Sequence, residues 1–206
     1  DVNTTGSHNT ALGSSALGAN TTADHNTAVG RWALLATTTG SDNVAVGSGA
    51  LDANTTGRMA VAVGRDSLGN NTTGEFNVAI GREAMASNTT GNFNTAVGLN
   101  ALSGNTTADG NVAVGRNAGV NITTGHENVA IGANALDALT TGNDHVAVGY
   151  AALGALTTGA RNTAIGYAAG ANATTSNNNV LVGYDAGVQI TTGGANVAIG
   201  VYALDA

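Results

Sequence analysis

Asn77-Val78-Ala79-Ile80-Gly81 decides the fold, because close variants of this stretch recur along the whole chain. Two of them are Asn43-Val44-Ala45-Val46-Gly47 and Asn196-Val197-Ala198-Ile199-Gly200. The closing glycine occupies positions 13, 30, 47, 64, 81, 98, 115, 132, 149, 166, 183 and 200, so every interval is 17 residues. The 206 residues therefore form an array of twelve units. Positions within a unit are called registers 1–17, counted from Asp1.

The composition of the unit favours strands over helices. Register 13 is always Gly, register 6 is nearly always Gly, and registers 4 and 5 are Thr in all twelve units. Each glycine would cost a helix about 1 kcal/mol. The short runs between glycines are rich in β-branched residues, which suit strands. We therefore predict an all-β fold over residues 1–206: one parallel β-solenoid or β-roll of twelve 17-residue coils, stacked about 4.8 Å apart into a rod on the order of 55–60 Å long.

Charge and composition exclude several classes of protein. The net charge is −7 and the chain contains no lysine, so binding to nucleic acid through a basic face is not expected. The chain has no cysteine, which excludes disulfides and thiolate metal sites. No apolar run is long enough for membrane insertion. The chain starts at Asp1 and both ends interrupt a unit, so we expect a fragment of a longer repeat protein.

The charged residues predict which registers face solvent. All 19 Asp, Glu and Arg residues fall on registers 1, 7, 8, 14 and 15, and the other twelve registers carry none. Charges are rarely buried without a partner. Registers 7–8 and 14–15 should therefore be outward corners, and registers 9–13 and 16–17 should form packed walls.

The strand at registers 10–12 is apolar on both of its faces. Val78 and Ile80 point to one side and Ala79 to the other. A strand that is apolar on both sides is usually buried on both sides. One interpretation is that register 11 meets another chain, with alanine permitting close approach. The alternative is that register 11 is alanine because a narrow single-chain coil has no room for a larger residue.

Apolar volume is exchanged between registers rather than lost. Register 17 is usually leucine, but where it becomes glycine an apolar residue follows at registers 1 and 3 of the next unit. Gly119 precedes Val120 and Ile122, and Gly187 precedes Val188 and Ile190. Dense packing requires such compensation, which indicates a real core.

Two polar ladders are expected to be structural. Asparagine occupies register 9 in ten units, with Ala60 and His145 as the exceptions, and should form an amide ladder between coils. The invariant threonine pair resembles the flat arrays of some ice-binding solenoids. The alternative is that one threonine faces inward, bonding along the coil, while the other shapes the turn, because adjacent residues point to opposite faces.

Candidate binding residues are the aromatic side chains, all of which lie on corner registers. Tyr150, Tyr167 and Tyr184 share register 14 in three consecutive units and should form an exposed stacked column, and Trp32 is a further candidate. Exposed aromatics bind glycan or protein, or cover a neighbouring chain. His8 and His25 stack without a third ligand, so no metal site is expected. No catalytic residues and no cofactor site are identified, so we do not expect an enzyme.

The Asn-Thr/Val-Ala-Val/Ile-Gly unit with its following Ala-Leu resembles the head repeats of YadA-like trimeric autotransporter adhesins. It equally resembles repeat arrays of phage and bacterial tail-fibre-like proteins. The resemblance spans the whole chain. It implies a left-handed parallel β-roll, three chains wound about one axis, and a surface adhesive or spacer role. The 17-residue period is longer than the usual head repeat.

From these observations we expect a structural or adhesive segment of an extracellular or virion-surface fibre, with variable corner residues as its binding surface. The expected partners are further copies of the chain, as a homotrimer or a filament, and a host-surface protein or glycan. The alternatives are a self-assembling extracellular filament subunit and an ice-binding β-solenoid that uses the threonine ladder.

Overall fold

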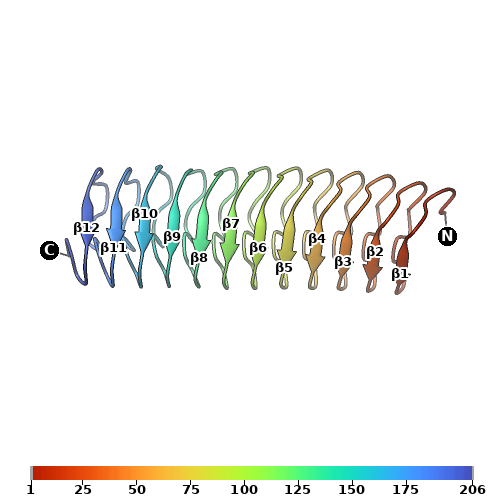
Figure 1. Ribbon diagram of the computed structural model, residues 1–206, viewed down its shortest axis with the longest axis horizontal. Helices are drawn as coiled ribbons and strands as arrows, with labels where there is room; N and C mark the ends of the chain where they lie inside the picture. The colour runs from red at the N-terminus through yellow and green to blue at the C-terminus, as the bar shows by residue number, and fades with distance from the viewer. Residues whose placement is uncertain (1, 206) are drawn as a thin grey trace.

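The computed structural model describes residues 2–205, so the first and last residues of the predicted array 1–206 lie outside the described part. Within residues 2–205 there are twelve strands and no helix, and the strands stack side by side in chain order along one rod (Figure 1). They form a single parallel sheet in which each strand pairs with the next. The strands are β1 (Thr10–Leu12), β2 (Thr27–Val29), β3 (Val44–Val46), β4 (Val61–Val63), β5 (Val78–Ile80), β6 (Thr95–Val97), β7 (Val112–Val114), β8 (Val129–Ile131), β9 (Val146–Val148), β10 (Thr163–Ile165), β11 (Val180–Val182) and β12 (Val197–Ile199). The predicted β-solenoid is confirmed.

The coils stack in one constant register. Val78 pairs with Thr95, and Ile80 with Val97, so partners are always one 17-residue unit apart. Only three residues of each unit form a strand, yet the rest of the coil also bonds to its neighbour. The backbone N–H of Leu34 donates to the carbonyl of Ala50 at 3.0 Å, and that of Thr38 to Thr55 at 3.1 Å. Coil-to-coil backbone hydrogen bonds therefore hold all sides of the rod, not the sheet alone.

The interior is narrow and built from alanine and leucine. Alanines at registers 11 and 16 and leucines at register 17 are buried; Ala79, Ala84 and Leu68 are each 0% exposed. Register 11 therefore points inward, and alanine is required there because the opposite wall lies close. The interpretation that register 11 meets another chain is wrong, and the narrow-coil alternative is confirmed. Registers 10 and 12, predicted to belong to a packed wall, point outward instead.

Two buried amide ladders run along the rod. At register 9, Asn77 Oδ1 accepts the backbone N–H of Asn94 at 3.0 Å, and Asn77 Nδ2 donates to the Gly91 carbonyl at 2.7 Å. This is the predicted ladder. A second ladder at register 3 was not anticipated: Asn88 Nδ2 donates to Asn71 Oδ1 at 2.7 Å. Because these amides are buried, each one satisfies backbone groups at a bend that no water reaches.

The corners depend on left-handed backbone conformations. Registers 8, 15 and 17 have positive φ, as in Phe76 (57°), Glu83 (56°) and Leu68 (50°). Register 13 requires glycine for two reasons. Gly98 has φ of 139°, and a Cβ there would lie 2.5 Å from the Gly115 carbonyl oxygen. Within residues 2–205 no Asp, Glu or Arg side chain is buried, which confirms the predicted corners.

The exchange of volume between registers 17 and 3 has a direct structural basis. A Cβ on Gly119 would lie 2.9 Å from Ile122 Cδ1 and 3.1 Å from Leu102 Cδ2, so Ile122 fills the space that a leucine at 119 would occupy. The asparagine ladder at register 3 ends at this point. Asn105 Oδ1 is buried without a hydrogen-bond partner, because the next residue of the column is Ile122 rather than asparagine.

We predict that Gly119→Leu and Ile122→Asn each destabilise the rod, by about 1–4 kcal/mol, through overpacking and lost burial respectively. The double variant recreates the Leu102–Asn105 arrangement and supplies a partner for Asn105 Oδ1. It should be more stable than the sum of the two single effects by about 1–3 kcal/mol. Urea unfolding followed by circular dichroism measures all four proteins. Additive effects would contradict the proposed exchange of volume.

Candidate binding surfaces

The outward face of the sheet is an uncharged apolar strip that runs the length of the rod. It consists of registers 10 and 12, where every residue is Val, Ile, Leu or Thr. Val46, Ile80 and Ile165 are 36%, 40% and 41% exposed. Contiguous apolar surfaces of this kind mark sites of association.

The strip alone is small for a stable interface. Twelve strands spaced about 4.8 Å apart, each three residues long, cover roughly 500–600 Å². A typical stable interface buries about 800 Å² per partner. The flanking columns at registers 8 and 14, which hold five of the seven aromatic residues, would supply the remaining area.

The predicted tyrosine column is confirmed. The rings of Tyr150 and Tyr167, and those of Tyr167 and Tyr184, stack with centroids 5.1 Å apart. The three side chains are 44–49% exposed. The ring faces that lie between stacked tyrosines are covered, so the middle of the column offers solvent mainly ring edges and hydroxyl groups. The negative charge of Asp185 contributes most to raising the pKa of Tyr184, and Tyr202 adds to it.

Trp32 does not join this column. It lies on register 15 of the second unit, seven coils from Tyr150, and the guanidinium of Arg31 covers its ring at 3.5 Å. Its exposed fraction is 39%. The four aromatic candidates therefore form two separate surfaces, and the Trp32 face is already occupied by a cation from its own chain.

The two threonines of each unit do not play the predicted roles of one inward-facing residue and one turn residue. Register 4 hydroxyls donate along the rod, as from Thr72 Oγ1 to the Thr89 carbonyl at 3.0 Å, but these side chains stay partly exposed rather than facing inward. Register 5 threonines, such as Thr73, are exposed throughout. Their hydroxyls make no hydrogen bond to any residue in the described range 2–205. The register 5 threonines form a single column of free hydroxyl groups, which we call the threonine column.

The stacked histidine pair lies at the surface of the first two coils. The rings of His8 and His25 stack at 4.8 Å, and both side chains are exposed. In the described part of the chain no three His, Cys, Asp or Glu side chains are grouped closely enough to hold a metal ion.

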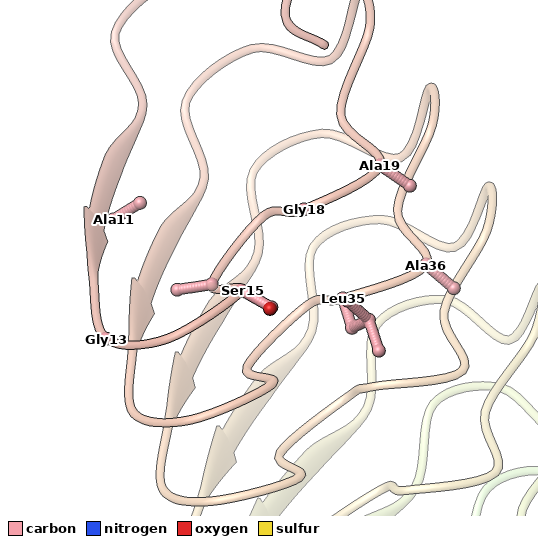
Figure 2. A pocket seen from close by; sticks show the side chains of 8 residues that line it. Ala11, Gly13, Ser15, Gly18, Ala19, Leu35 and Ala36 are labelled. Carbon is pink, nitrogen blue, oxygen red and sulfur yellow. The ribbon is translucent and has the colours of Figure 1, made fainter. Parts of the chain in front are cut away.

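A hollow of about 700 Å³ lies beside the first coils and is lined mainly by small residues (Figure 2). Its lining includes Ala11, Gly13 and Leu35. Ala11 is exposed, whereas its counterpart Ala28 is fully buried. The hollow is therefore the open end of the rod's interior, where β1 pairs with β2 alone.

His145 is a titratable residue built into the buried register 9 ladder, where sequence inspection identified it only as a departure from asparagine. Its Nδ1 accepts the backbone N–H of Asn162 at 3.2 Å, in place of the usual asparagine Oδ1. Nε2 is buried without a hydrogen-bond partner. Burial lowers the pKa of His145 from 6.5 to about 4, although the Gly159 backbone and the Asp144 carboxylate act in the opposite direction. The folded rod therefore holds this imidazole neutral.

We predict that His145 makes the rod less stable in acid. Well above pH 6.5 the His145 imidazole is neutral in both the folded and the unfolded chain, so it adds no pH dependence to the free energy of unfolding. As the pH falls from 6.5 towards 4, the unfolded chain binds a proton that the folded chain excludes. The free energy of unfolding then decreases, by on the order of 3 kcal/mol in total.

The control is His145→Asn, which restores the ladder residue without the titratable ring. Unfolding of both proteins should be measured between about pH 7.5 and pH 4, because the carboxylates titrate equally in each. The stability difference should widen steadily in favour of the asparagine variant as the pH falls. A difference independent of pH would contradict the prediction.

Comparisons with protein-family models, curated proteins and solved structures found no match to this chain. Residues 2–205 contain no helix that is long and apolar enough to cross a membrane.

Proposed function

We propose that this chain is a structural segment of an extracellular or virion-surface fibre, in which the outward sheet face packs against further copies of the same chain. The observation that carries the proposal is the uncharged apolar strip of registers 10 and 12, which continues over all twelve strands. β-branched residues suit a strand in any case, but a solvent-exposed spacer would also accept charged residues on such a face, and the strip has none.

The resemblance to YadA-like heads and tail-fibre-like repeats supports an assembly of three chains. Three rods with parallel axes would bring three strips together at equal spacing, because each strip has the same strand repeat. The variable corners would then carry any adhesive function, while the alanine, glycine and asparagine registers preserve the rod. The role requires no catalytic residue or cofactor.

The assembly is tested by light scattering at two protein concentrations. We expect a mass of three chains, each 19.9 kDa, that does not change on dilution. Ile131→Lys with Ile165→Lys places two charges on the strip and should give monomers with unchanged circular dichroism. Thr124→Lys with Thr158→Lys places the same charges on the threonine column and should leave the mass unchanged.

Other outcomes decide between the remaining roles. A monomeric wild-type protein would contradict the proposal that the strip packs against further copies of the chain. Mass that grows with concentration would favour the filament, in which the unpaired outer edges of β1 and β12 stack end to end.

Ice binding is the second candidate function, and the threonine column is the observation that favours it. Its hydroxyl groups are exposed and free of protein hydrogen bonds, and they repeat once per coil at about 4.8 Å. If this column binds ice, the protein at micromolar concentration will show thermal hysteresis, and the Thr124→Lys and Thr158→Lys variant will lose it. The absence of hysteresis in the wild-type protein would eliminate this role.

A further inference from the structure

A notch interrupts the corner column at register 8, between β6 and β8. Phe76 and Phe93 stack in this column with ring centroids 5.0 Å apart. The next residue of the column is Gly110, which has no side chain, and Glu127 follows it one coil further on. A hollow of about 540 Å³ occupies this place. Its lining residues are Phe93, Asp109, Gly110, His126, Glu127, Asn143 and Asp144.

The missing side chain uncovers one face of an aromatic ring. Phe76 lies between Met59 and Phe93 in the column and is 40% exposed. Phe93 has Phe76 on one side and Gly110 on the other, and its exposed fraction rises to 63%. The free face of Phe93 therefore forms one wall of the notch, in contrast to the tyrosine column, where neighbouring rings cover one another.

The opposite side of the notch carries the carboxylates of Glu127 and Asp144. The chain has three glutamates, and two of them are paired with arginine: Glu75 with Arg58 at 2.8 Å, and Glu83 with Arg65 and Arg82 at 3.2 Å. Within residues 2–205 Glu127 and Asp144 form no ion pair. Asp109 accepts a backbone hydrogen bond from Asn92 through Oδ1 at 2.6 Å, so this carboxylate is held in place.

We propose that the notch at Gly110 binds a guanidinium group, the side chain of an arginine on a partner protein. The guanidinium would lie flat on the Phe93 ring, and the carboxylates of Glu127 and Asp144 on the other side of the slot would offset its positive charge. A planar cation suits this site better than an ammonium, because it stacks on an aromatic face and donates in a fixed plane.

The spacing of the side chains and a similar contact elsewhere in the chain both support a guanidinium group in the notch. Phe93 and Glu127 are two coils apart, about 9.6 Å, which leaves room for one flat group between their side chains. A Cβ on Gly110 would lie 3.5 Å from Glu127 Cγ, an ordinary contact, so one carbon atom fits at this point without rearrangement. The same chain already places the Arg31 guanidinium 3.5 Å from the centroid of the Trp32 ring.

The inference goes beyond the proposed fibre role and is tested separately from it. The probe is N-acetyl-arginine methylamide, titrated into the ¹⁵N-labelled protein and followed by TROSY NMR. We expect saturable shifts centred on Phe93, Gly110 and Glu127, with a dissociation constant on the order of 10 mM, as for one exposed cation–π contact with ion pairs. The citrulline derivative, equal in shape but neutral, should cause none, and the lysine derivative should bind more weakly.

Two variants and a control locate the site. Gly110→Phe fills the slot and should abolish the shifts; it should fold, because Phe93 adopts the same positive φ at the equivalent position. Glu127→Gln should weaken binding about threefold, in keeping with an exposed charge pair. Glu83→Gln, on the other corner, should have no effect.

Equal binding of citrulline or lysine, shifts spread over all acidic corners, or unchanged binding to the phenylalanine variant would overturn the assignment. A monomeric protein that still binds the probe here would refute the fibre assembly and leave this site intact.

Discussion

The structure depends on one constraint: each coil must present the same backbone groups at the same places as the coil before it. Hydrogen bonds between coils occur in the strands and on the other sides of the rod, always between residues about 17 positions apart. An insertion of one residue would shift the donors of the coil that holds it away from their acceptors on the neighbouring coils and turn buried side chains of that coil outward. The strict 17-residue period is therefore a requirement of the hydrogen bonding.

Because the coils stack in register, each register forms a column of like residues, which stabilises some residue types and not others. Asparagine gains from it, because an amide both donates and accepts and so satisfies its neighbours along the ladder. Phenylalanine and tyrosine gain ring stacking. Charges gain only where opposite signs alternate, as at Arg58 and Glu75. A change of residue type in a column leaves a group unsatisfied at Asn105 beside Ile122, and the ring of His145 leaves one nitrogen unpaired.

Such interruptions also give the rod its individual surfaces. A perfect repeat would present identical corners on every coil and could bind a partner equally well anywhere along its length. The glycine at 110 breaks the register 8 column and exposes one aromatic face at one place. Binding specificity on a solenoid therefore follows from departures at the variable corners, whereas the invariant registers determine only that the rod exists.

The sequence by itself determined the period, the β-solenoid class, the outward corners and the register 9 ladder. These follow from local chemistry: glycine spacing, the restriction of charges to a few registers, and the pairing capacity of asparagine. Only the tertiary structure decided which face of the strand is inside, because Val78, Ala79 and Ile80 are apolar on both sides and pattern alone could not choose. It also decided that stacked tyrosines hide their ring faces while Phe93 exposes one. Those outcomes depend on distances across the narrow coil and on neighbours 17 residues away.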